Sequence, residues 1–179
     1  MAVTLNETPS GNRLHIGIFG KTNSGKSSFI NTFSGQKVSI VADVAGTTTD
    51  PVYKSMEIYP LGPCVLIDTA GFDDEGELGA LRIEKTSLAA QKTELAIILF
   101  CGDEMVQELK WYNYFKKRQT PVIPVLGKAD LYTQEQKEYL IQMIQKNTGE
   151  TVCPVSSETG EGIRKLKELL AEKIPEGYG

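Results

Sequence analysis

The sequence predicts an α/β domain with a six-stranded, mostly parallel sheet, one antiparallel edge strand, and helices on both faces. Three observations predict this class. A Gly-rich loop joins an apolar run to a helical segment, apolar runs alternate with helical periodicity further along, and one Pro-Gly turn joins two adjacent strand-like runs. Strands that alternate with helices favour a parallel sheet. In such a sheet a ligand binds at the carboxyl ends of the strands.

The Gly-rich loop is the segment 20–27, GKTNSGKS, which has the spacing of a phosphate-binding loop, G-x-x-x-x-G-K-[S/T]. Leu14–Phe19 before it predicts a buried strand, and Ser28–Phe33 after it predicts a helix that ends near residue 35. Backbone N–H groups of such a loop and the helix N-terminus bind phosphate oxygens. The pattern predicts that Lys26 reaches the β- and γ-phosphates and that the Ser27 hydroxyl holds Mg²⁺.

The next stretch predicts an antiparallel pair. Residues 36–50 have no helical period, and a loop of this length in a compact domain is usually functional. Residues 52–59 alternate in polarity, which predicts an edge strand. The turn at 60–63 then sends the strand Cys64–Ile67 back alongside it.

That strand ends in a D-x-x-G pattern at Asp68 and Gly71. Its place, after a buried strand and downstream of the phosphate loop, predicts that Asp68 holds a Mg²⁺-bound water and that the Gly71 N–H meets the γ-phosphate. Residues 72–81 form a Gly-rich acidic loop, and residues 82–92 read as a helix.

The remaining chain supplies strands and helices in alternation. Continuous apolar runs predict strands at Leu95–Phe100, Val122–Leu126 and Val152–Val155. Helical spacing predicts three buried helix faces, formed by Met105, Leu109, Tyr112 and Phe115, by Leu140, Met143 and Ile144 after a capping box at Thr133 and Gln136, and by Ile163, Leu166, Leu169 and Leu170.

Composition excludes several classes of protein. The 179 residues carry a net charge of −4 with no Lys/Arg-rich block, which argues against stand-alone binding of nucleic acid. No apolar run approaches membrane-spanning length. The chain has three scattered cysteines and one histidine, which argues against a disulfide framework and against a zinc or iron–sulfur site in this chain. We expect the histidine, His15, to be a packed residue. We expect a cytoplasmic protein with a flexible arm over residues 1–12 and one domain over 13–175.

Two late loops resemble the base-reading loops of GTP-binding domains. Lys128 and Asp130 fit the pattern [N/T]-K-x-D, whose Asp accepts from guanine N1–H and N2–H₂ and whose Lys packs along the base. Ser156 and Ser157 fit the second loop, where a backbone N–H meets guanine O6. Gly127 stands where Asn is usual, so we expect guanine selectivity with weaker affinity; one lost hydrogen bond is worth about 0.5–1.5 kcal/mol.

Taken together, the five loops resemble those of translation-factor-type GTPases, which have a Ras-like P-loop fold. Asn23 and the Gly-Thr-Thr at 46–48 make the chain similar to the TrmE–Era branch. The stretch 46–79 is similar to the GTPase domain of HydF, the [FeFe]-hydrogenase maturation protein. Gly127, Ala70 and Thr49 depart from the usual residues.

The resemblance to HydF implies an N-terminal GTPase domain excised from a longer maturase, without that family's dimerisation and [4Fe–4S] cluster domains. Its implied partners are the other domains of the maturase, radical-SAM maturases and the hydrogenase. The resemblance implies GTP or GDP with Mg²⁺ as ligands, held by Asn23, Ser24, Gly25, Lys26, Ser27, Ser28, Asp68, Gly71, Lys128, Asp130, Ser156 and Ser157.

Hydrolysis needs a group that orients the attacking water. Phe72 stands where Ras-like enzymes have Gln, so the TrmE-like resemblance implies slow turnover stimulated by K⁺ bound at Asn23. Thr48 is the expected switch ligand to Mg²⁺, with Thr47 as the alternative. Catalytic candidates are Lys26, Thr48, Gly71, Asp74 and Glu77, and Asp73 and Glu75 are equal alternatives for orienting water. Two other functions stay open: an RNA-related GTPase in tRNA modification or ribosome assembly, and a nucleotide-sensing module with negligible turnover.

Overall fold

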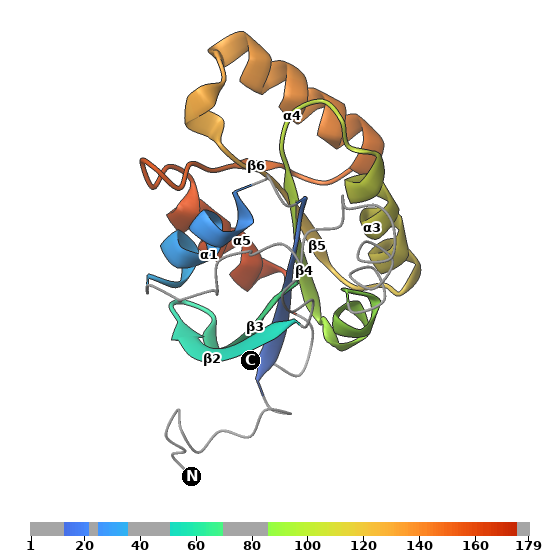
Figure 1. Cartoon of the computed structure of the whole chain (residues 1–179), viewed down its shortest axis with the longest axis vertical. Coiled ribbons are helices and arrows are strands. Elements are labelled where there is room, and N and C mark those ends of the chain that lie inside the picture. Colours follow the sequence, from blue (N-terminus) through green and yellow to red (C-terminus); the bar gives the residue numbers. More distant parts are fainter. Residues whose placement is uncertain (1–12, 22–24, 36–50, 70–85, 175–179) are drawn as a thin grey trace, which may run out of the picture.

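The computed structural model describes residues 13–21, 25–35, 51–69 and 86–174. Within them lies a six-stranded sheet in the order β2-β3-β1-β4-β5-β6 (Figure 1). Only the β2–β3 pair is antiparallel, so the predicted sheet is confirmed. The strands are β1 Leu14–Phe19, β2 Val52–Ile58, β3 Gly62–Asp68, β4 Leu95–Phe100, β5 Val122–Leu126 and β6 Cys153–Pro154.

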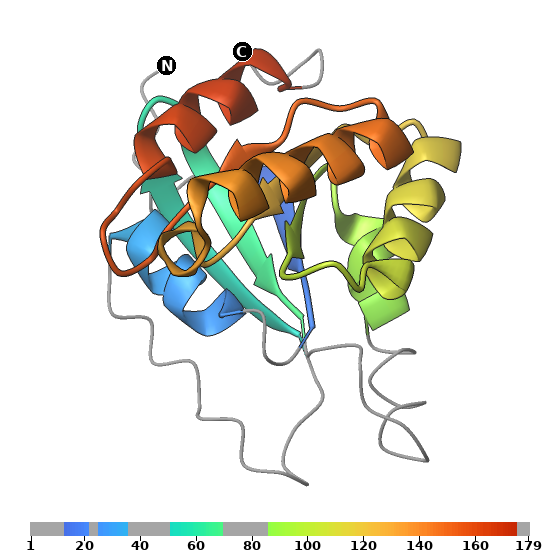
Figure 2. The same cartoon turned by 90° about the horizontal axis from the view of Figure 1, so that it is seen from above.

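Helices cover both faces of this sheet, as predicted. The helices are α1 Lys26–Ser34, α3 Val106–Lys117, α4 Gln134–Thr148 and α5 Ile163–Glu172, with the short 3₁₀ helix η3 at Ala129–Leu131. Residues 86–92 are also helical, and residues 82–85 of the predicted 82–92 helix lie outside the described part. In Figure 1 and Figure 2, α1 and α3 lie on opposite sides of the strands. None of the described helices has the length and apolar character needed to cross a membrane.

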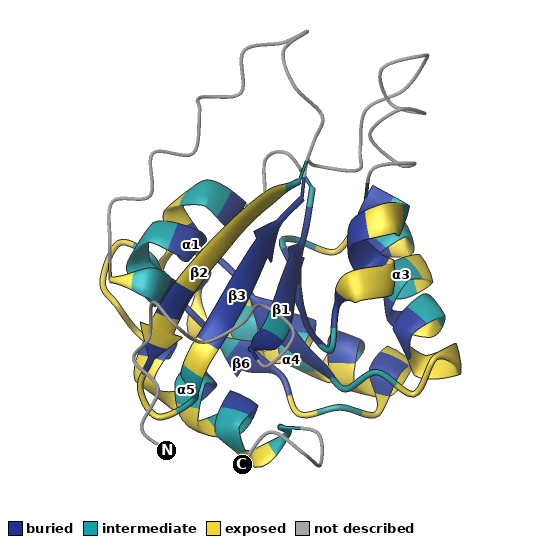
Figure 3. Cartoon of the chain, turned by 90° about the horizontal axis from the view of Figure 1, so that it is seen from below, coloured by how far each residue is buried: buried dark blue, intermediate teal, exposed yellow. Residues whose placement is uncertain are grey.

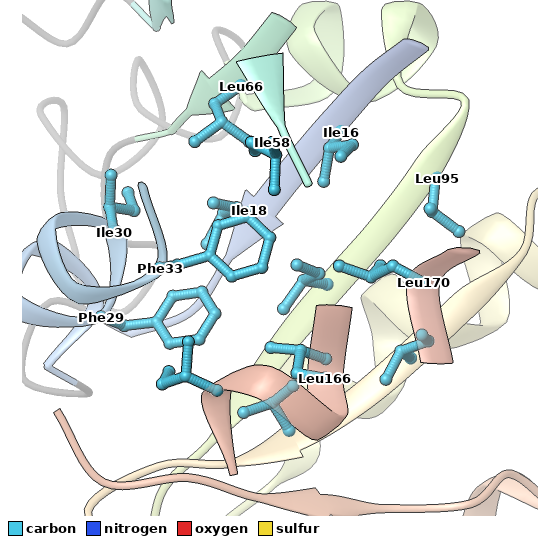
Figure 4. Packing of buried hydrophobic residues seen from close by; sticks show 14 of the residues in the cluster. Ile16, Ile18, Phe29, Ile30, Phe33, Ile58, Leu66, Leu95, Leu166 and Leu170 are labelled. Carbon is cyan, nitrogen blue, oxygen red and sulfur yellow. The ribbon is translucent and has the colours of Figure 1, made fainter. Parts of the chain in front are cut away.

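Three apolar clusters lie between the sheet and the described helices: two large ones, and a small one formed by Val65, Ile67 and Ala89. On one face, α1 and α5 pack on alternate residues of the strands; Figure 4 shows Phe33 of α1 beside Ile18 of β1, with Leu166 of α5 in the same cluster. On the other face, α3 and α4 pack on the residues in between, such as Ile98. Because β4 is buried on both faces, its sequence is a continuous apolar run rather than an alternating one.

Strand β2 is the predicted edge strand. Its first four residues are exposed and only Met56 and Ile58 are buried, as Figure 3 shows by the contrast with β3. The predicted capping box of α4 is present, with Gln136 N–H donating to Thr133 Oγ1 at 3.1 Å and Thr133 N–H donating to Gln136 Oε1 at 2.9 Å.

Strand β6 is shorter than the predicted 152–155. Its ladder covers only Cys153 and Pro154. The carbonyl of Val155 accepts the Ala129 N–H at 2.9 Å and so joins a loop instead of continuing a strand. The prediction was wrong at this end because the competing partner is a distant loop that local pattern does not reveal.

Of the histidine and the cysteines noted in the sequence, His15, Cys64 and Cys153 lie within strands, and Cys101 follows the carboxyl end of β4. His15 Nδ1 lies 2.9 Å from Glu94 Oε1, near the amino end of β1. The three cysteines are free. Burial raises the pKa of the Cys64 thiol to about 12 and that of the Cys153 thiol to about 11, while Cys101 is half-buried.

Candidate nucleotide site

The candidate site lies where the parallel strands end. Strand β1 leads into the phosphate loop, β3 ends at Asp68, β5 leads to the loop at 127–131, and β6 leads to Ser156. Strands β1 and β3 pair so that Ile18 is level with Asp68. The topology therefore brings together, at one edge of the sheet, the loops that the sequence places far apart.

The phosphate loop ends at Gly25, the N-cap of α1. Gly25 has φ +81°, a left-handed conformation that favours glycine. A Cβ built there would also lie 3.2 Å from Cε of Lys128. The cap is made by backbone alone, without a side-chain hydrogen bond, and it begins the helix on Lys26. This glycine therefore serves both the turn and the close approach of the lysine stem.

Lys26 and Asp68 form a buried ion pair at this edge. Lys26 Nζ lies 2.7 Å from Asp68 Oδ1 and also donates to the carbonyl of Thr69. Lys26 is only 8% exposed, and Thr69 Oγ1 donates to the Ile18 carbonyl at 2.9 Å. Buried charges need such compensation. The arrangement holds an ammonium and a carboxylate at one point between α1 and β3.

A hollow of about 470 Å³ begins at Gly25, the residue that precedes Lys26. Gly25, the N-cap of α1, lines it together with Ser28 and Phe29 of that helix, and Leu99 lines it from β4. The loops after β5 and β6 close its other side through residues that include Gly127, Lys128, Asp130 and Ser157. A volume of this size, partly apolar and with a few polar groups, is ordinary for a small-molecule site.

Asp130 is held in place by the loop after β6. Ser156 Oγ donates to Asp130 Oδ1 at 2.7 Å, and the Thr159 N–H donates to Ser156 Oγ at 3.1 Å. Ser156 is fully buried. Because the hydroxyl is itself oriented by a backbone amide, the carboxylate keeps one direction at the rim of the hollow.

The two residues of the predicted Ser156–Ser157 loop differ in where they lie relative to the hollow. The Ser156 N–H donates to the Glu161 carbonyl at 3.0 Å, so this amide is engaged within the loop. Ser157 lines the hollow, and its carbonyl accepts from Thr32 Oγ1 of α1 at 3.3 Å. Of the two, Ser157 is therefore the one that borders the hollow.

Sequence reasoning missed two residues that shape this loop. Thr159 orients Ser156, as described above. Gly162 has φ +78°, and a Cβ there would lie 2.0 Å from the Pro154 carbonyl oxygen. The only signal in the sequence was the Gly160-x-Gly162 spacing, which by itself predicts a turn.

Gly127 contributes a backbone hydrogen bond to this loop but no side chain. Its N–H donates to the Phe100 carbonyl at 3.0 Å, and the residue borders the hollow. The amide that Asn would supply at this position is absent. Lys128, the next residue, takes the left-handed conformation with φ 57°.

Several predicted residues lie outside the described part of the chain. They are Asn23, Ser24, Thr47, Thr48, Ala70, Gly71, Phe72, Asp73, Asp74, Glu75 and Glu77. Ser27 and Ser28 are described, half-buried and exposed respectively, in the first turn of α1. The described residues contain no group of three His, Cys, Asp or Glu that could hold a metal ion. Mg²⁺ bound with phosphates needs only one or two protein oxygens, and Ser27 and Asp68 fit that requirement.

Comparison with known proteins agrees with this geometry. Residues 15–128 match the family described as 50S ribosome-binding GTPase. GTPase Der of Wolinella succinogenes is 36% identical over 97% of this chain, and tRNA modification GTPase MnmE of Endomicrobium trichonymphae is 33% identical over 94%. The chain spans 38% of the length of each. Era of Aquifex aeolicus bound to GDP·AlF₄⁻ superposes with a TM-score of 0.76 at 26% identity, covering 91% of this chain and 57% of that one.

Proposed function

The chain belongs to the 50S ribosome-binding GTPase family, and we propose that it is a slow, Mg²⁺-dependent and K⁺-stimulated GTP-hydrolysing switch domain extending over residues 13–175. The observation that carries this proposal is the joint placement of the Lys26–Asp68 pair and the oriented Asp130 at one edge of the sheet. One end of that edge suits a triphosphate and the other suits a purine base.

At the phosphate end, Lys26 exchanges its partner. Its ammonium would leave the Asp68 carboxylate and bind β- and γ-phosphate oxygens. Ser27 and Asp68 would then hold Mg²⁺, Asp68 through a water. When bound, Mg²⁺ neutralises charge on the phosphates. The close pairing of Lys26 with Asp68, 2.7 Å between Nζ and Oδ1, supports these roles because both groups already lie within reach of one ligand.

At the base end, Asp130 accepts hydrogen bonds from guanine N1–H and N2–H₂. Adenine offers neither donor, so this carboxylate favours guanine. Lys128 packs its stem along the base, and a Ser157 backbone amide meets O6. Since Gly127 supplies no side-chain amide, we expect the affinity for guanine nucleotides to be lower than with Asn there.

The assignment of the group that orients the attacking water is argued from the sequence alone. Phe72 cannot orient water, so we propose that K⁺ bound at Asn23 and one carboxylate among Asp73, Asp74, Glu75 and Glu77 assist. Thr48, or Thr47 in its place, would complete the magnesium ligands, and the Gly71 N–H would meet the γ-phosphate. Equal turnover in KCl and NaCl at one ionic strength would remove the potassium part. Unchanged turnover after alanine replacement of each acidic residue would remove the carboxylate part.

We propose, on the resemblance of residues 46–79 to HydF, that the switch serves an [FeFe]-hydrogenase maturation scaffold, with the other maturase domains, radical-SAM maturases and the hydrogenase as partners. A second function, in tRNA modification or ribosome assembly, is supported by the family description, 50S ribosome-binding GTPase, and by the likeness to tRNA modification GTPase MnmE. RNA retention that falls steeply between 50 and 200 mM salt would support this second function. Its absence at 50 mM salt would count against it.

Isothermal calorimetry tests the central proposal. The protein is titrated with GTP, GDP, ATP and XTP in Mg²⁺, with K⁺ or Na⁺. We expect heat with GTP and GDP, little with ATP, and loss of triphosphate binding in Lys26→Ala. Absence of heat with guanine nucleotides, or undiminished binding by Lys26→Ala, would refute the assignment.

A further inference from the structure

Helix α3 carries a carboxylate in its first turn that the proposed chemistry does not use. The Glu108 side chain is 0% exposed. A buried carboxylate is destabilising unless a cation or hydrogen bonds compensate it. Its cationic partner is Lys21, whose Nζ lies 3.4 Å from Glu108 Oε2.

Lys21 is the second residue of the phosphate loop, where the chain leaves β1. Its ammonium also donates to the carbonyl of Glu104 at 2.6 Å. The segment before α3 and the first turn of α3 thus hold the same ammonium from two sides. The Lys21 side chain is only 21% exposed, so water screens this pair less than a surface ion pair.

The residue at the end of β1 is held by the same helix. The Phe19 ring stacks on Trp111 with 5.6 Å between centroids, and it lies 5.0 Å from Phe115. Helix α3 therefore contacts the start of the phosphate loop twice. Trp111 stacks on Phe19, and Glu108, one turn nearer the N-terminus of the helix, pairs with Lys21.

We propose that Glu108 is a positioning residue for nucleotide binding, which holds Lys21, and with it the start of the phosphate loop, against α3. This rests on the proposed role of segment 20–27 in binding phosphates. Residues that are already held before a ligand binds lose less freedom on binding, so we expect the pair to raise affinity.

The sign of the effect separates positioning from simple charge. If Glu108 acted only as a negative charge near phosphates, its neutralisation would strengthen binding. If it positions Lys21, its neutralisation weakens binding, although one negative charge has been removed. Glu104→Gln is the matched control, because it removes a charge from an exposed side chain of the same segment and keeps the backbone carbonyl that Lys21 uses.

The test is calorimetric titration of the full chain with GDP and Mg²⁺ below the melting temperature. Glu108→Gln and Lys21→Met should each bind GDP about 3- to 10-fold more weakly. The double variant should be no weaker than either single one, because both remove the same interaction. Lys21→Arg, which keeps the cation, should retain affinity, and Glu104→Gln and Lys110→Met should bind as the unmodified protein does.

Equal or tighter GDP binding by Glu108→Gln and Lys21→Met would overturn the proposal while leaving the GTPase assignment intact. Failure of the unmodified protein to bind GDP would instead refute the proposed function. If Lys21→Met does not fold, because it leaves the buried Glu108 carboxylate without this cation, Glu108→Gln and Lys21→Arg carry the comparison.

Discussion

Replacing Ser156 with alanine should weaken GDP binding by disordering Asp130. The Ser156 hydroxyl lies 2.7 Å from Asp130 Oδ1 and is fully buried, so no water takes its place without rearrangement. Without this bond the carboxylate must be ordered by the base itself. Immobilising one side chain costs about 0.5–1.5 kcal/mol, which corresponds to a loss of affinity of about 2- to 12-fold.

The same substitution should lower stability by a separate amount. Hydrogen bonds to charged groups contribute about 1.5–3 kcal/mol, and the Thr159 N–H also loses its acceptor. For a domain of this size each kcal/mol lowers the melting temperature by roughly 2–4 °C. Calorimetry with GDP at a temperature where both proteins are folded, together with thermal melting, separates the two effects.

Ser157→Ala is the matched control because it removes a neighbouring hydroxyl and keeps the backbone that borders the hollow. We expect it to bind GDP nearly as the unmodified protein does. The reasoning would be refuted if Ser156→Ala melted earlier but bound GDP with unchanged affinity. The bond would then stabilise the loop without organising the base site.

Two further predictions concern packing and thiol chemistry. Gly17→Ala should destabilise the fold by about 1–3 kcal/mol, because a Cβ there would lie 2.3 Å from Thr93 Oγ1. Thermal melting measures this loss, and Gly35→Ala is the comparison. At Gly35 a Cβ meets no atom within 4 Å but φ is +70°, so that variant reports backbone strain without crowding. A thiol reagent at pH 8 should label Cys101 first, because burial raises the pKa of Cys64 and Cys153 and keeps these two thiols protonated and covered. Three equivalents of label on the native protein at the rate seen in denaturant would contradict this.

Local pattern was enough to predict the elements whose burial is complete. Strand β4 and strand β5 have the predicted bounds because strands covered on both faces must be apolar at every position. The α4 capping box could be predicted because its two partners are only three residues apart in the sequence. Such features depend on short-range chemistry that a single sequence displays.

Features that depend on the approach of distant segments could not be predicted. The bond from Ser156 to Asp130 joins two loops 26 residues apart, and no local period records it. The same holds for Gly162, whose constraint is the Pro154 carbonyl, and for the pairing of Glu108 with Lys21. These contacts become visible only once the topology has placed the loops at one edge.

The two ends of the site should respond differently to GDP and GTP. In the proposed function Asp130 and Ser157 contact the base, which the two nucleotides share, so their contacts should add equally to both binding free energies. A ligand can bias a switch only through interactions that differ between the two states. Ser156→Ala should therefore weaken GDP and GTP binding by the same factor. Lys26→Ala should weaken GTP binding more than GDP binding if Lys26 binds the γ-phosphate as proposed. Titration of each variant with both nucleotides gives, for each variant, the ratio of its GTP affinity to its GDP affinity. A changed ratio in Ser156→Ala would mean that the base loop itself senses the γ-phosphate, and an unchanged ratio in Lys26→Ala would place that discrimination in other residues.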